Sequence, residues 1–133
     1  MTNAENALQG IEAFNRRDFD AALAGFHPEI EWKPAADLGP EPKVYRGHAG
    51  VLEFWDTWLG TMDDFELEVT ECIDAPADRV FVTARARGRG KGSGAPVEGE
   101  LHQVFEYEGR AVVRVRLFGS RAAALEAAGL DES

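Results

Sequence analysis

The chain has 133 residues, 44% of them hydrophobic and 29% charged, which is the size and balance of one domain with its own core. Its 24 acidic and 14 basic side chains give a formal net charge of -10, which disfavours binding to nucleic-acid phosphates and to anionic membrane surfaces. The first residues show no signal-peptide pattern, and the single cysteine, Cys72, excludes an internal disulfide. We therefore expect one cytoplasmic domain over residues 1–133 that binds neither nucleic acid nor membrane.

Helical periodicity marks the beginning of the sequence. Apolar residues at a three-residue spacing predict a first helix over residues 3–16, and Asp18 is placed to cap a second one. The second helix should end at Pro28, because the residue before a proline is displaced from helical conformations. Ile30 and Trp32 then share one face of a short strand with alternating apolar and charged residues.

The segment YRGHAGVLEFWDTW, residues 45–58, follows a proline-rich loop and predicts a third helix that begins at Gly47 or His48. One side of this helix carries a broad apolar stripe formed by Val51, Leu52, Trp55, Trp58, Leu59 and Met62. Phe54 lies beside the stripe. The helix should pack its two tryptophans against the sheet that follows.

From residue 65 onward the hydrophobic period changes to two, which is typical of strands. Four alternating runs predict an antiparallel meander, over residues 65–73, 79–90, 97–107 and 110–118. Ser120 is placed to cap a short C-terminal helix, and Gly129 to end it in the left-handed conformation. Helices followed by a meander predict an α+β domain.

The expected direction of His102 depends on the last hairpin. Glu108-Gly109 fits a two-residue turn, and this turn would pair His102 with Val115. Because the most apolar face of the last strand should be the inner one, His102 is expected to point inward. An inward histidine is either a core residue with satisfied hydrogen bonds or a neutral acid/base at the wall of a cleft.

Metal and cofactor sites are not expected. The three histidines lie far apart in the sequence and none has an HxxxH partner. The segment GRGKGSGA, residues 88–95, matches part of a phosphate-binding pattern, but Pro96 and an alternating run follow it where a helix would be needed. We interpret it as a hairpin connection.

Three stretches, FNRRDFDAALAGFHPEIEW, YRGHAGVLEFW and EYEGRAVVRVRLF, resemble the nuclear transport factor 2-like superfamily, and within it SnoaL-like and ketosteroid isomerase-like proteins. The resemblance implies a cone: a strongly curved antiparallel sheet packed on three N-terminal helices, with a short C-terminal helix and a deep apolar pocket. It also implies a homodimer formed through the outer face of the sheet, where Phe105, Val112 and Phe118 are expected.

The resemblance also suggests roles for single residues. His102 stands where ketosteroid isomerases place an aspartic acid that donates a hydrogen bond to the substrate oxyanion. Pro34 and Gly10 stand where those enzymes carry their base and their oxyanion tyrosine, so two of the three isomerase groups are replaced. Gly119 lies in the region where cyclase-like members carry an acid/base aspartate.

Two hypotheses follow. In the first, the domain binds a small, largely apolar molecule in the cone, and His102 performs isomerase- or cyclase-like proton transfer. In the second, it is a catalytically silent ligand-binding or dimerisation domain. The side chains expected around the ligand are Trp32, Tyr45, Phe54, Glu100, Val104 and Val115. A second polar group beside His102 that faces an open cavity would favour the enzyme.

Overall fold

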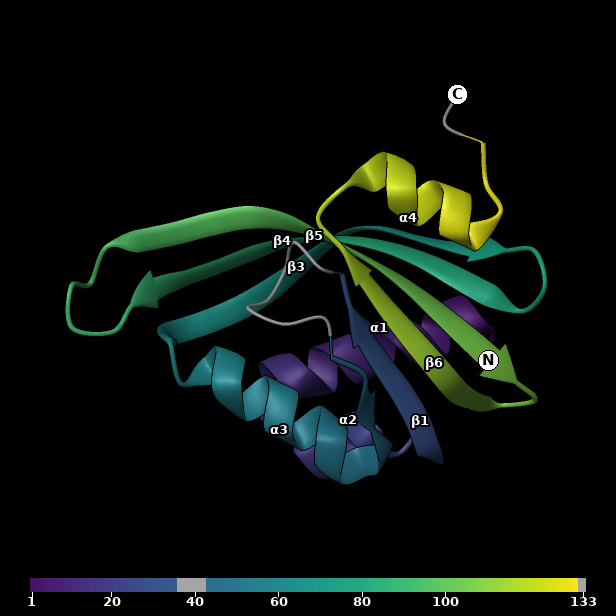
Figure 1. Cartoon of the computed structure of the whole chain (residues 1–133), viewed down its shortest axis with the longest axis horizontal. Coiled ribbons are helices and arrows are strands. Elements are labelled where there is room, and N and C mark those ends of the chain that lie inside the picture. Colours follow the sequence, from purple (N-terminus) through teal and green to yellow (C-terminus); the bar gives the residue numbers. More distant parts are fainter. Residues whose placement is uncertain (36–42, 132–133) are drawn as a thin grey trace.

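Figure 1 shows the computed structural model of the chain, which describes residues 1–35 and 43–131. In chain order the elements are α1 (Asn3–Asn15), α2 (Phe19–Leu23), β1 (Phe26–Pro34), β2 (Tyr45–Arg46), α3 (Gly47–Leu59), β3 (Met62–Ala75), β4 (Arg79–Gly90), β5 (Pro96–Glu108), β6 (Ala111–Phe118) and α4 (Arg121–Ala128). The predicted α+β order of helices and strands is confirmed. None of the helices in the two described ranges is long and apolar enough to cross a membrane.

The strands form one six-stranded sheet in the order β2-β1-β6-β5-β4-β3. Strands β3 to β6 make the predicted antiparallel meander, whereas β1 runs parallel to β6. Parallel neighbours need a long connection, and here α3 and the first three strands of the meander lie between the two paired strands. The sheet is therefore mixed and open, with β2 and β3 as its edges.

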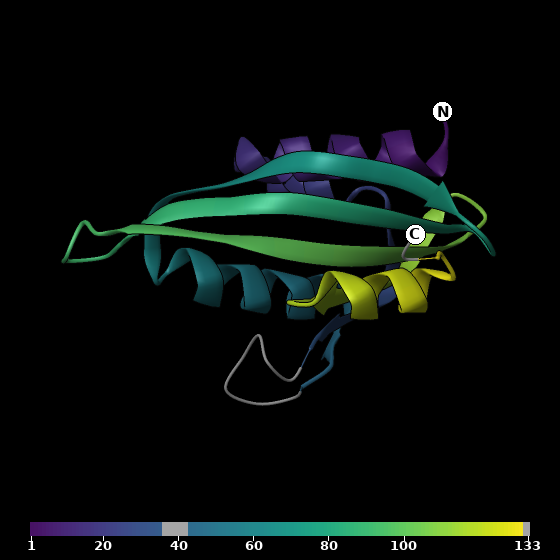
Figure 2. The ribbon, with the colours of Figure 1, turned by 90° about the horizontal axis from the view of Figure 1, so that it is seen from above.

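Helices cover the two faces of the sheet unequally (Figure 1). Helices α1, α2 and α3 pack on one face, which we call the inner face, and α4 packs alone on the opposite, outer face. Along β4 the side chains alternate accordingly: Val80 and Val82 belong to the inner core, and Phe81 belongs to the cluster under α4. Seen from above, the three long strands β3, β4 and β5 run between the helices and bend along their length (Figure 2).

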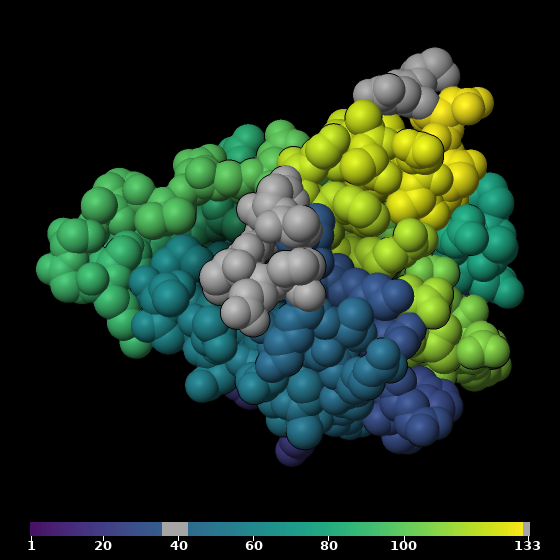
Figure 3. All heavy atoms as spheres, viewed as in Figure 1, coloured from purple at the N-terminus to yellow at the C-terminus, as the bar shows by residue number. Residues whose placement is uncertain are grey.

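The ends of the helices follow the sequence signals. The side chain of Asp18 caps α2, and that of Ser120 caps α4. Gly129 ends α4 with a φ of 77°, in the left-handed region that glycine adopts without strain. Gly47 is the first residue of α3, as predicted. The β4–β5 hairpin turns at residues 91–93, and its tip stands out from the body of the molecule (Figure 3), so the glycine-rich segment is a hairpin connection.

Two details of the helical half differ from the prediction. Helix α2 ends at Leu23 and the first strand already begins at Phe26, so Pro28 lies inside a strand. The pairing of β1 with β6 shifts register at this point, which lets the strand accommodate a residue without a backbone N–H. On α3, Phe54 is buried and Leu52 is 37% exposed, so the apolar stripe is rotated toward Phe54.

The register of the last hairpin also differs from the predicted one. The turn consists of Gly109, with a φ of 62°, and Arg110, one residue later than predicted, so Glu108 pairs with Ala111. Strand β6 then carries an extra residue, Val113, as a β-bulge. A bulge of one residue moves the side chains beyond it to the opposite face. The predicted inward direction of His102 is therefore wrong: His102 and Val104 point to the outer face, and Val115 pairs with another residue.

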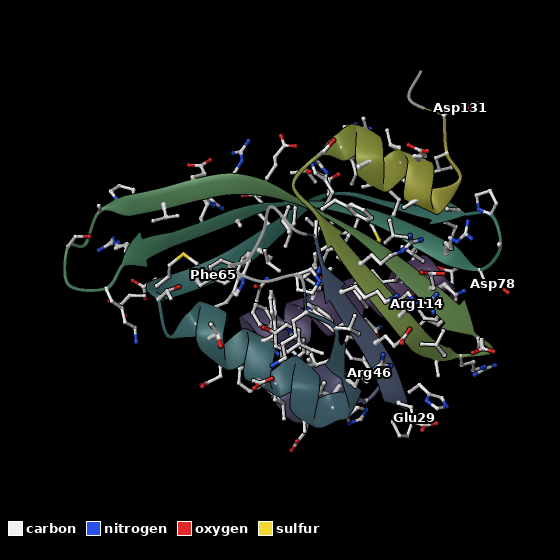
Figure 4. The ribbon with its side chains drawn as sticks, viewed as in Figure 1. Glu29, Arg46, Phe65, Asp78, Arg114 and Asp131 are labelled. Carbon is white, nitrogen blue, oxygen red and sulfur yellow. The ribbon has the colours of Figure 1, made fainter. Side chains whose placement is uncertain are left out.

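The outer face is more charged than the sequence suggested. Phe105 and Val112, which were expected there, point inward and are 3% and 1% exposed. Their place on the outer face is taken by ion pairs, in which the Arg114 guanidinium lies 2.9 Å from Glu31 and 3.3 Å from Glu106. Figure 4 shows Arg114 on β6, near Arg46 of β2, which also contacts Glu31. The homodimer stays a prediction, without the apolar patch that suggested it.

Candidate functional site

A cavity of about 570 Å³ lies between the inner face of the sheet and helices α1, α2 and α3. This volume is in the range typical of small-molecule sites in proteins. Its walls are largely aromatic, with rings from Phe14, Phe26, Trp32, Phe54, Trp55, Trp58, Phe65 and Phe105. Figure 4 labels one of them, Phe65, at the start of β3 above α3.

The rings of the cavity wall hold one another in place. Trp55 of α3 contacts Phe14 of α1 and Trp32 of β1, at centroid distances of 5.1 and 5.8 Å, in edge-to-face geometry. Phe54 contacts Trp32 at 5.7 Å and Trp58 at 5.4 Å. The two tryptophans of α3 were expected only to pack the helix on the sheet, but both also line the cavity. The aromatic segment therefore builds the core and the pocket wall with the same side chains.

Two buried polar atoms at the cavity have no hydrogen-bond partner within the described part of the protein. Among the described residues, four buried side-chain nitrogen or oxygen atoms have no hydrogen-bond partner. Two of the four, Glu106 Oε2 and Arg116 Nε, lie 3.1 Å apart and form an ion pair. The other two are Trp32 Nε1 and Gln103 Oε1, and both residues line the cavity. Buried polar groups are normally hydrogen-bonded, so these two are the places where a bound molecule can be recognised.

Charged groups mark the opening of the cavity. Among the described lining residues, the titratable side chains are Glu12, Arg16 and Arg110, and all three are exposed. They come from α1, from its C-cap residue and from the β5–β6 turn, so the charged part of the lining is also its solvent-exposed part. In residues 1–35 and 43–131, no group of three or more His, Cys, Asp or Glu side chains is arranged to hold a metal ion.

His102 lies on the other side of the sheet, in a hydrogen-bonded chain beneath α4. Its Nδ1 is 2.9 Å from Thr83 Oγ1 and its Nε2 is 3.4 Å from a Glu100 carboxylate oxygen, while Arg121 lies 3.5 Å from the same hydroxyl. A neutral ring satisfies the chain: Arg121 donates to Thr83, Thr83 donates to Nδ1, and Nε2–H lies near the Glu100 carboxylate. Burial against Phe81 lowers the pKa of His102, and this effect exceeds the opposing attraction of Glu100.

The residues predicted to contact a ligand are only partly brought together. Trp32 and Phe54 line the cavity. Tyr45 packs on the ring of Phe54 at 5.3 Å without lining the cavity, and Val115 is buried beside Trp32 in the neighbouring strand. Glu100 and Val104 were expected on the inner face with His102, but both lie on the outer face: Glu100 is exposed beside the histidine and Val104 packs under α4. Ligand contact by any of these side chains stays a prediction.

Gln103 is the site residue that sequence reasoning missed. It was passed over because the predicted register placed it outside, although its strand contained a signal. Leu101, Phe105 and Tyr107 share its side of β5, and this side is more apolar than the one that carries His102. If the more apolar side of β5 is taken as the inner face, Gln103 is predicted to be a polar side chain among apolar ones inside the domain.

Comparisons with solved structures agree with this architecture. TerC co-crystallized with polyporic acid aligns with a TM-score of 0.78 at 24% identity, covering 93% of this chain and 95% of that one. An NTF2-like protein of unknown function from Burkholderia pseudomallei aligns with a TM-score of 0.77 at 21% identity, covering 96% and 98%. A putative SnoaL-like polyketide cyclase from Jannaschia sp. CCS1 aligns with a TM-score of 0.75 at 19% identity, covering 97% and 92%. At these identities the likeness shows the fold alone.

The sequence itself was compared with family models and with curated proteins. No curated protein matches the chain. A family model described as a SnoaL-like domain matches residues 7–122, which is most of the chain and includes all but one of the residues that line the cavity. The chain therefore belongs to the SnoaL-like domain family, with the nuclear transport factor 2-like fold that its sequence motifs predicted.

Proposed function

We propose that this domain binds a small, largely apolar molecule in the cavity between the inner face of the sheet and helices α1 to α3. The observation that carries the proposal is an aromatic-walled cavity of about 570 Å³ with an opening to solvent. A bicyclic ligand that removes roughly 200 Å² of apolar surface from water would gain about 5 kcal/mol, before the cost of its lost motion. This gain alone corresponds to a dissociation constant of roughly 0.2 mM at best, so tighter binding requires walls that are already in place and polar groups that the ligand can pair with.

The lining supports binding rather than proton transfer. A general acid or base must reach the reacting atom of the substrate within hydrogen-bond distance. Among the described residues, the titratable side chains of the cavity lie at its opening, and His102 is separated from it by the sheet. TerC was crystallised with polyporic acid, which supports an organic molecule as the ligand class for this fold. We therefore favour the binding domain over an isomerase or a cyclase.

The test is to fill the cavity and to measure binding of an apolar probe. Leu101 lines the cavity and is 5% exposed, so Leu101→Trp should occupy part of the space. The matched control is Val97→Trp, which adds the same ring near the exposed start of the same strand, at a residue that is 44% exposed. Equilibrium dialysis against naphthalene measures affinity, and circular dichroism confirms that both variants are folded.

The parent and Val97→Trp should bind naphthalene alike, and Leu101→Trp should bind it at least about tenfold more weakly, because part of the buried contact area is lost. Undiminished binding by Leu101→Trp would place the ligand elsewhere on the protein. A parent that binds neither naphthalene nor its oxygenated relatives would refute the proposed function itself.

A further inference from the structure

We infer that the ligand of this cavity is a neutral, oxygenated aromatic molecule, and that Trp32 and Gln103 are the residues that select it. The inference rests on the proposed binding function and names the chemical class that the same site would take. It concerns two polar groups within an otherwise apolar wall.

The polar pair is buried where a ligand would lie. Trp32 is 4% exposed and Gln103 is 3% exposed, and both line the cavity. Trp32 Nε1 and Gln103 Oε1 have no hydrogen-bond partner among the described residues. A buried polar group that stays unpaired is costly, so a fold that keeps two of them at one cavity gains when a bound molecule pairs with them.

The chemistry of the two groups restricts the ligand. The indole N–H of Trp32 can only donate, so it requires an acceptor such as a hydroxyl, ether or carbonyl oxygen. The amide of Gln103 offers both an acceptor oxygen and two donor hydrogens, so it pairs with a hydroxyl or a carbonyl. Neither side chain carries a charge. The pair therefore matches oxygen substituents on a neutral ring system.

The positions of the two side chains suit a ligand with two such groups. In the sheet, Trp32 lies in a row with Val115 and Phe105, and Gln103 lies in the next row, opposite Leu117. Trp32 and Gln103 thus start from strands β1 and β5, with β6 between them, about 10 Å apart across the sheet. Oxygen substituents on opposite edges of one ring system would meet one side chain each.

Charge at the cavity favours a neutral molecule over an anion. The charged lining groups of the described chain, Glu12, Arg16 and Arg110, are exposed at the opening. A carboxylate placed deep among the aromatic rings would lose its hydration without gaining a cation. A neutral hydroxyl loses less and is compensated by Trp32 or Gln103.

A series of probes with one common ring tests the inference. The probes are naphthalene, 2-naphthol, 2,6-dihydroxynaphthalene and 2-naphthoate, and equilibrium dialysis gives their affinities. Each hydroxyl that finds its partner should strengthen binding by roughly three- to tenfold over the preceding probe, as one net hydrogen bond does. The anion 2-naphthoate should bind more weakly than naphthalene.

Variants assign the gain to the two residues. Trp32→Phe and Gln103→Leu each replace a polar group by an apolar side chain of similar or smaller size. Each variant should therefore bind 2,6-dihydroxynaphthalene only about as tightly as the parent binds 2-naphthol. Because both side chains also form part of the wall, the quantity to compare is the ratio of diol affinity to naphthalene affinity, which should fall in each variant. The matched control is Thr57→Val, which removes a hydroxyl from an exposed residue of α3 outside the cavity lining and should leave the whole series unchanged. Thermal melting confirms the fold, and if Trp32→Phe does not fold, Gln103→Leu alone decides.

The outcomes separate this inference from the proposed function. If naphthalene binds and neither hydroxyl improves affinity, the domain binds apolar molecules but the polar pair does not select them. Tightest binding of 2-naphthoate would show that the site selects anions. A hydroxyl gain that survives both substitutions would show that other groups, or ordered water, meet the ligand. Failure of all four probes to bind would refute the binding function.

Discussion

Thr83→Val is the sharpest test of the hydrogen-bonded chain beneath α4. Valine keeps the shape of threonine and removes the hydroxyl that lies 2.9 Å from His102 Nδ1. His102 is 2% exposed, so its ring nitrogen would be left without a partner in a water-excluded site. Such a loss costs about 1 to 3 kcal/mol of unfolding free energy. For a domain of this length, the melting temperature should fall by about 4 to 11 °C.

The effect of Thr83→Val should depend on the histidine. In His102→Leu the buried nitrogen is absent, and the Glu100 carboxylate is exposed enough to be hydrated. Adding Thr83→Val to His102→Leu should then cost little, because replacing both partners of a hydrogen bond by apolar groups is nearly neutral. The coupling between the two substitutions should reach about 1 kcal/mol or more, as for residues in direct contact.

Urea denaturation followed by circular dichroism at pH 7.5 measures the four unfolding free energies of this cycle. If the unfolding free energies lost by the two single variants sum to that lost by the double variant within about 0.5 kcal/mol, Thr83 and His102 are not energetically coupled. The control is Thr70→Val, which removes an exposed hydroxyl bonded to the Thr83 backbone carbonyl and should not couple to His102→Leu.

Two further predictions use the pKa directions of buried groups. Burial lowers the pKa of His102, so the unfolded chain binds this proton at a higher pH than the folded chain does. The unfolding free energy should therefore be unaffected by this group above a pH of about 6.5 and should decrease as the pH falls below it. If the unfolding free energy of His102→Leu decreased equally over the same pH range, the prediction would be contradicted. Burial also raises the pKa of the Cys72 thiol, whose Sγ lies 3.3 Å from the Ala4 carbonyl oxygen. Iodoacetamide should therefore alkylate Cys72 several times more slowly in the folded protein at pH 8 than in the protein unfolded in urea. Equal alkylation rates in the two states would contradict the prediction.

Much of the fold was predictable because local signals agreed with the tertiary structure. Asp18, Ser120 and Gly129 mark helix ends through their own side chain or backbone, and no distant contact overrides them. The period-two runs of the meander were long enough to be unambiguous. The parallel pairing of β1 with β6 was not predictable from periodicity, because alternation indicates a strand but not its neighbour.

The candidate site was harder to predict because it depends on one residue. The bulge at Val113 carries no glycine or proline to reveal it, and it reverses the face of every side chain beyond it in β5. Trp32 and Phe54 lie on other elements, which the bulge does not affect, and both line the cavity. Because of this reversal, His102 lies on the outer face and Gln103 on the inner face, opposite to the prediction. The polar group at the cavity is therefore an amide and not the predicted acid/base.

The two faces of β5 carry different structures: the cavity wall on one side and the packing of α4 on the other. In β5, Leu101, Gln103 and Phe105 face the cavity, while His102 and Val104 face the cluster under α4. The inner face holds most of the hydrophobic core as well as the cavity, so Leu101 and Phe105 also contribute to stability. Substitutions at His102 and Val104 should lower stability and spare affinity for the proposed ligand, because both side chains lie on the other side of the sheet. Among the inward residues, Gln103 is the one whose replacement by leucine should lower affinity for an oxygenated ligand without lowering stability, because its amide oxygen has no partner among the described residues.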